Sequence, residues 1–167
     1  NKKERPAFIM KEKYLKSYET GRYNLIVMSA FTLINIILLL LGSDMYFLFS
    51  AAIPYFTAIF PHVLAVEIPS YASWILPLAG VSALMLVPYF LAFFLGKNPE
   101  KYGWMIFALV CFAIDTAGFF ILFGISVEGI VDLIFHLWVL VYLILAVRAG
   151  AKLKAQSHNM PEATEIK

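Results

Sequence analysis

The chain has 167 residues, of which 62% are hydrophobic and 14% are charged, and its formal net charge is +2. Soluble domains average about 45–50% apolar and 25% charged residues, so this composition excludes an ordinary soluble domain and predicts an integral membrane protein. No basic face exists apart from the flanks of the apolar segments. We therefore expect the lipid bilayer as a partner and no nucleic acid.

Residues 1–22 form a basic leader, which contains seven of the thirteen Lys and Arg residues. Apolar residues such as Phe8 and Ile9 are interleaved with its lysines. This pattern predicts a short amphipathic helix on the cytoplasmic surface of the membrane, although a solvated leader fits it equally well. The remaining basic residues lie in 97–101 and 148–167.

Four apolar segments match the roughly 20 residues that are needed to cross ~30 Å of hydrocarbon. They cover residues 24–41, 72–95, 103–123 and 130–147. We expect them to form a single four-helix transmembrane domain over 23–150, followed by a cytoplasmic polar tail over 151–167. Within the second segment, Pro77 and Pro88 are expected to kink the helix.

The stretch 45–70 is also apolar enough to span a membrane. Prolines and ionisable residues interrupt it: Pro54, Pro61, His62, Glu67 and Pro69. If it spanned, the basic residues of 97–101 and 148–154 would lie on the opposite side from the leader. If it does not, every Lys and Arg lies on one side of the membrane.

Basic residues mark the cytoplasmic ends of membrane helices, which favours the arrangement with four spans. The predicted fold is therefore all-α and polytopic, with both termini in the cytoplasm. A re-entrant or interfacial segment then covers the outer face over 44–71, and Asp44, Glu67 and Glu128 lie on that face. Compact size points to a bacterial inner membrane, the cell membrane of such an organism.

Known catalytic signatures are absent from the sequence: it has no HExxH, GxSxG, Walker or GxGxxG motif. The single Cys111 excludes an intramolecular disulfide. The sequence therefore favours a role other than catalysis, and enzymatic activity stays an open alternative. What remains is a set of polar residues inside the spans, where each is costly and therefore a candidate for function.

The fourth span carries Glu128, Asp132 and His136 at successive spacings of four, which places them on one helix face. Asp115 lies in the middle of the third span. A short turn over 124–129 makes the two helices antiparallel. Asp115 and His136 then fall at similar depth, on the order of 10–13 Å from the outer helix ends. We expect them to form a pair.

Asn35 on the first span and Ser82 on the second reach comparable depths. The pattern predicts an outward-opening pocket that binds or passes a small cation, a metal ion or protons. Its floor would be Asp115 and His136, its wall Asp132 and Glu128, and its lid His62 and Glu67.

Two other readings stay open. In the first, the protein is structural or serves assembly, and the Asp115–His136 pair only locks two helices together. In the second, it is an intramembrane metalloenzyme in which His136, Asp132 and Asp115 hold a divalent metal. Haem is disfavoured because His62 would have to reach down into the bundle. A small solute or ion is the expected partner of the pocket, and a homo-oligomer stays open.

Overall fold

The structure is a computed structural model, which describes residues 4–123 and 129–158. These residues form helices and connecting segments without any strand. In chain order the elements are α1 (Glu4–Leu40), α2 (Ala52–Glu67), η1 (Pro69–Trp74), α3 (Ile75–Leu84), α4 (Val87–Leu95), η2 (Pro99–Lys101), α5 (Gly103–Phe123) and α6 (Ile130–His158).

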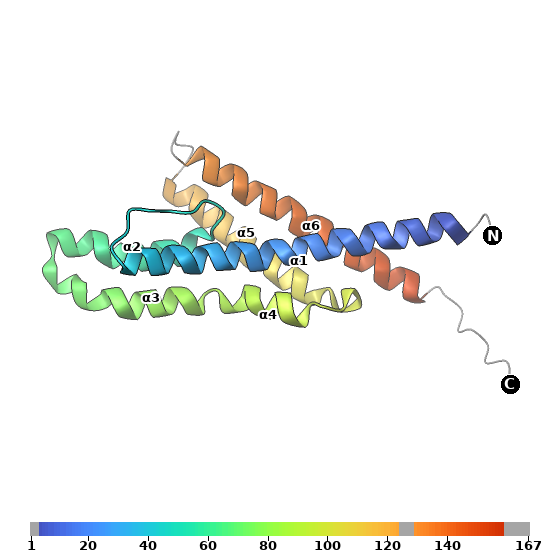
Figure 1. Cartoon of the computed structure of the whole chain (residues 1–167), viewed down its shortest axis with the longest axis horizontal. Helices are drawn as coiled ribbons and strands as arrows, with labels where there is room; N and C mark the ends of the chain where they lie inside the picture. The colour runs from blue at the N-terminus through green and yellow to red at the C-terminus, as the bar shows by residue number, and fades with distance from the viewer. Residues whose placement is uncertain (1–3, 124–128, 159–167) are drawn as a thin grey trace.

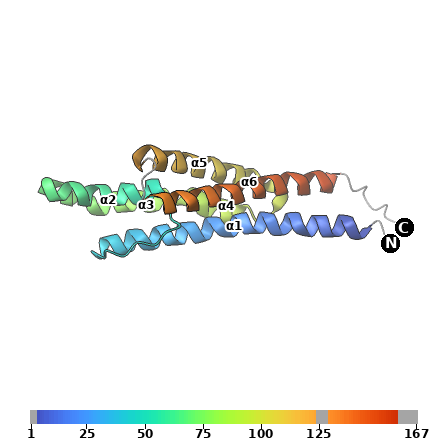
Figure 2. The ribbon, with the colours of Figure 1, turned by 90° about the horizontal axis from the view of Figure 1, so that it is seen from above.

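Four helical segments of the described chain are long and apolar enough to cross a membrane, which confirms the predicted fold class. They are Ile9–Leu40, Pro69–Leu95, Gly103–Leu122 and Ile130–His158. All run roughly along the long axis of the molecule (Figures 1 and 2). The terminal end is the one where α1 begins and α6 ends, and it also carries η2. The distal end is the opposite one and carries η1.

Residues 4–22 continue the first span as one unbroken helix rather than forming a helix of their own. Nothing between the first turn and Gly42 breaks the helix, and two side chains tie this part to the end of α4. The Tyr18 hydroxyl donates to the Gly96 carbonyl at 2.9 Å. The Arg22 guanidinium donates to the Phe93 carbonyl at 3.0 and 3.2 Å. Both groups satisfy carbonyls that a helix C-terminus leaves unpaired.

The second span is broken between α3 and α4, after Leu84. Pro88 stands in the first turn of α4, where a missing backbone N–H costs nothing. Pro77 likewise stands in the first turn of α3 and leaves that helix unbroken. The expected kink is therefore found near Pro88 and not at Pro77.

The helices pack most closely at glycines. A Cβ atom added to Gly21 of α1 would lie 2.5 Å from the Ala146 Cβ atom and 3.0 Å from the Tyr142 carbonyl oxygen of α6. Small residues of this kind let membrane helices approach each other. The main core then lies between α1, α4, α5 and α6, and its largest fully buried members include Tyr18, Leu25, Met28, Leu86, Met105, Phe112 and Leu143.

The returning segment, residues 43–51, is the part of the fold that places the candidate site. After α1 ends, Gly42 adopts a positive φ of 71° and reverses the chain. Figure 1 shows the returning segment as a thin trace that runs back beside α1 before α2 begins. α2 then runs toward the distal end, η1 reverses the chain, and α3 comes back alongside α2.

Side chains of α1 hold the returning segment in place. The Asn35 amide group makes two hydrogen bonds to Phe47: Nδ2 donates to its carbonyl at 2.7 Å, and Oδ1 accepts from its N–H at 2.8 Å. Further along, the Ala51 N–H donates to the Thr32 hydroxyl at 2.7 Å. Thr32 lies about 12 Å along the helix axis from Leu40. The segment between the first two spans thus folds back against α1, and protein side chains satisfy part of its non-helical backbone.

Aromatic packing completes this turn into α2. Phe49 has a positive φ of 73°, a conformation that costs energy for any residue other than glycine. Its ring packs edge-on against Phe135 and Trp138 of α6, with ring centroids 5.5 and 5.8 Å apart. These contacts compensate for the backbone strain.

Candidate functional site

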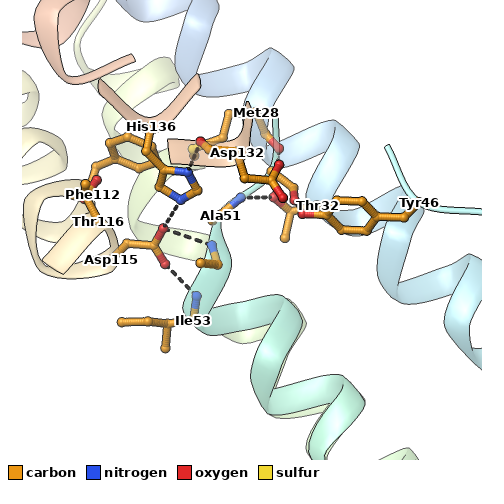
Figure 3. A network of polar contacts seen from close by, with 12 residues as sticks. Met28, Thr32, Tyr46, Ala51, Ile53, Phe112, Asp115, Thr116, Asp132 and His136 are labelled. Atoms are coloured by element: carbon orange, nitrogen blue, oxygen red, sulfur yellow. Dashed lines mark hydrogen bonds and ion pairs between the residues drawn. The ribbon is translucent and has the colours of Figure 1, made fainter. Parts of the chain in front are cut away.

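Asp115 is the centre of a buried polar network that joins α2, α5 and α6 (Figure 3). Its Oδ2 atom accepts from the Ala52 N–H at 2.9 Å and lies 3.2 Å from Nε2 of His136. Its Oδ1 atom accepts from the Ile53 N–H at 2.7 Å. Asp115 is 2% exposed and His136 is 3% exposed. One carboxylate thus satisfies donors from two other helices.

Asp115 performs for α2 the task of an N-cap residue. The first N–H groups of a helix have no partner within the helix, and they attract negative charge. The residue at the N-cap position itself, Ala51, has no side chain that can cap. Gly118 lets α5 come close to this helix start, since a Cβ atom there would lie 2.8 Å from Cδ1 of Ile53. The cap is therefore supplied across the bundle rather than by the local sequence.

His136 is held from both faces and at both nitrogens. Its ring stacks between Phe112, with centroids 5.4 Å apart, and Phe119, at 4.8 Å. Nδ1 lies 2.8 Å from the backbone carbonyl of Asp132, which can only accept, so Nδ1 carries a hydrogen. A second proton is then needed in the contact between Nε2 and the Asp115 carboxylate. With that proton, the His136–Asp115 pair is neutral as a unit, which suits its burial.

The sequence predicts that Asp115 and His136 form a pair, because residue counting places them at similar depth. In the structure the two side chains are in contact. Two of the other predicted pocket residues, Asn35 and Ser82, have different partners. The Asn35 side chain is engaged with the returning segment. The Ser82 hydroxyl donates to the Leu78 carbonyl of its own helix at 2.9 Å. Polar groups that residue counting places at similar depth therefore do not all face one another.

The predicted lid residues lie on α2. Nδ1 of His62 lies 3.1 Å from the Ala58 carbonyl one turn earlier, and Glu67 is the last residue of the helix and exposed. The first residues of α2 contact Asp115, and the helix then runs toward the distal end (Figure 1). His62 and Glu67 therefore lie on the distal side of Asp115. Glu128 falls outside the described residues.

Asp132 lies in the first turn of α6, where the helix dipole favours a carboxylate. Its side chain is half-buried. The carboxylate makes no hydrogen bond or ion pair with any residue in 4–123 or 129–158. It points toward Tyr46 of the returning segment (Figure 3). The Tyr46 and Ser50 hydroxyls share a hydrogen bond of 2.8 Å. Burial, reinforced by the negative charge of Asp132, raises the pKa of Tyr46 to about 12, so its hydroxyl keeps its proton.

The described residues include no group of three or more His, Cys, Asp or Glu side chains that could hold a metal ion. Asp115, Asp132 and His136 are all within the described chain and do not form such a group. Both nitrogens of His136 already face oxygen atoms of the protein. The geometry of the pair suits hydrogen bonding rather than coordination.

The sequence did not identify three residues of this network. The backbone N–H groups of Ala52 and Ile53 belong to ordinary apolar residues, and nothing in their identity marks them as ligands of a carboxylate. Thr32 could have been recognised as a candidate, because it is a polar residue inside the first span and lies on the same helix face as Asn35, three positions later.

No family model matches this chain, and neither the curated proteins nor the solved structures contain a match to it. Its function has to be inferred from the site itself.

Proposed function

We propose that this chain is a structural or assembly protein of the membrane, in which the Asp115–His136 pair fixes the segment between the first two spans. One observation carries the proposal: the buried Asp115 carboxylate accepts from both amides at the start of α2 and contacts His136 of α6. A carboxylate inside a membrane is costly unless partners compensate it. Here the partners come from the protein itself.

The sidedness we propose follows from the basic residues. Every Lys and Arg that the structure describes lies on the terminal half of α1, on the terminal half of α6, or at the turn around η2. Basic residues favour the cytoplasmic side. Both termini would then be cytoplasmic in a multi-pass cell-membrane protein, and the α2–α3 hairpin would face the opposite compartment.

A cysteine reporter tests the role of the pair. Ser50 is 3% exposed, so a cysteine at that position, in a Cys111→Ser background, should react slowly with a maleimide. Adding Asp115→Asn removes the charge that the α2 amides and His136 require. The returning segment should then open more often, and labelling should accelerate by roughly tenfold or more, as a loss of about 1.4 kcal/mol implies.

Ser82→Ala is the matched control, because Ser82 is equally buried but bonds only within its own helix. It should leave the labelling rate unchanged. Slow labelling in the Asp115→Asn protein, equal to that of the reporter alone, would rule out the proposed role.

A second candidate function is favoured by Asp132. Its half-buried carboxylate has no hydrogen-bond or ion-pair partner in the described chain and lies beside Tyr46. Such a group would bind a small cation or take up protons from the distal side. Cation-dependent thermal stabilisation that is lost in Asp132→Asn and kept in Glu67→Gln would support it. Equal stabilisation of both variants would contradict it.

A further inference from the structure

A groove of about 730 Å³ opens at the terminal end, far from the Asp115 network. Its walls come from η2, the first turns of α5 and the last part of α6. Two lysines, Lys101 and Lys154, lie on its rim, and Trp104, Ile106 and Phe107 form much of the remaining wall.

The groove exists because α6 lies directly against η2. A Cβ atom on Gly150 would lie 2.5 Å from the Tyr102 Cβ atom and 3.2 Å from the Pro99 carbonyl oxygen. Only glycine permits this approach without a shift of either element. Lys154 follows Gly150 by about one turn of α6, so the close contact places it beside the same groove as Lys101.

The two lysines are exposed. Within the described residues, neither ammonium group lies within ion-pair distance of a carboxylate. Glu100 also lines the groove, yet it forms no such pair with either lysine. Two unpaired cations on the rim of one groove attract an anion.

The side of the groove that α5 forms is apolar and open. Ile106 is 41% exposed and Phe107 is 45% exposed, and Trp104 packs edge-on against Phe107 with centroids 6.4 Å apart. These residues stand in the first turns of α5, where its membrane span begins. Tryptophan prefers this boundary between headgroups and hydrocarbon. The groove thus has a cationic part at the membrane boundary and an apolar part that continues into the span.

We propose that this groove binds an anionic phospholipid. Its phosphate would contact Lys101 and Lys154, the Trp104 indole would lie at headgroup level, and an acyl chain would follow Ile106 and Phe107. A lipid fits better than free phosphate, because only an amphiphile uses both the cationic and the apolar part. Basic pockets between membrane helices on the cytoplasmic side bind anionic headgroups.

The test measures lipid retention by the full-length protein. The protein is reconstituted in phosphatidylcholine bilayers that contain a minority of phosphatidylglycerol, extracted in mild detergent and examined by native mass spectrometry. Lys101→Gln with Lys154→Gln should weaken phosphatidylglycerol retention by about fivefold for each lysine removed. The control, Lys97→Gln with Lys152→Gln, removes two exposed lysines of the same end that do not line the groove, and it should retain the lipid.

Glu100→Gln gives a change of the opposite sign, since it removes the one carboxylate of the groove and should strengthen retention. A second readout uses Trp104 as the sole tryptophan, after Trp74→Phe and Trp138→Phe. Phosphatidylglycerol with brominated acyl chains should quench its fluorescence more strongly than brominated phosphatidylcholine.

Two outcomes would overturn the proposal. One is equal retention by the groove variant and by its control, which would mean that the lysines act only through the general charge of the surface. The other is displacement of phosphatidylglycerol by millimolar inorganic phosphate, which would identify a site for free phosphate. Circular dichroism of each variant excludes misfolding as the cause of a loss.

Discussion

The two ends of the molecule treat ionisable groups differently. In the distal half, Asp115 and His136 are almost fully buried and meet partners on other helices. At the terminal end, Lys101 and Lys154 are exposed and meet no carboxylate within the described residues. A buried charge without partners is costly, whereas an exposed one remains hydrated. Removing the buried ionisable groups of the distal half should therefore alter stability, and removing the exposed lysines of the terminal end should alter binding.

The largest effect is expected for Asp115→Ala. The substitution leaves His136 and the two amides at the start of α2 without their acceptor, which should lower the free energy of unfolding by about 3–5 kcal/mol. Thermal unfolding in detergent measures it. Thr116→Val is the control, because the neighbouring Thr116 hydroxyl donates only to the Phe112 carbonyl of its own helix. Equal losses in the two proteins would show that the partners of Asp115 on α2 and α6 do not account for its contribution to stability.

The next largest effect on stability is expected from overpacking the contact between α6 and η2 at the terminal end. Gly150→Ala places a methyl group where Tyr102 and Pro99 already lie, and it should cost about 1–3 kcal/mol. Gly80→Ala is the matched control, since a Cβ atom there meets nothing within 4 Å. If thermal unfolding shows no difference between these variants, α6 and η2 do not pack as closely as described.

The two hydrogen bonds between Asn35 and Phe47 should contribute less to the free energy of unfolding, because both groups are neutral. Asn35→Leu removes both hydrogen bonds to Phe47 and should cost about 1–2 kcal/mol. Asn35 and Asp115 hold the same part of the chain between the first two spans, so the double variant with Asp115→Asn should lose less than the sum of the single losses. Strict additivity in a double-mutant cycle would show that the two anchors act independently.

The smallest effect on stability is expected for the two lysines of the groove, whose replacement should have the largest effect on lipid retention. Lys101→Gln with Lys154→Gln changes exposed side chains without ion pairs and should shift the free energy of unfolding by no more than about 0.5 kcal/mol per site. The measurement is thermal unfolding in lipid-free detergent. A loss comparable to that of Asp115→Ala would show that these lysines have structural partners after all.

The sequence by itself determined the class of the protein and the number of its spans. Stretches of about 20 apolar residues have few other uses, and the basic residues outside them separated four spans from five. It also paired Asp115 with His136, because the short connection over 124–129 makes α5 and α6 antiparallel. Counting residues from that turn is then enough to match their depths.

The tertiary structure decided which way each polar group faces. Counting residues places Asn35 and Ser82 at depths similar to that of the pair. In the structure, however, Asn35 holds the returning segment and Ser82 bonds within its own helix. Depth follows from counting residues, but facing depends on how each helix is rotated by its packing. The role of Asp115 as a hydrogen-bond acceptor depended also on where the fold places the start of α2. Its partners are backbone amides of Ala52 and Ile53, which every residue except proline possesses, so only the fold could place them at the carboxylate.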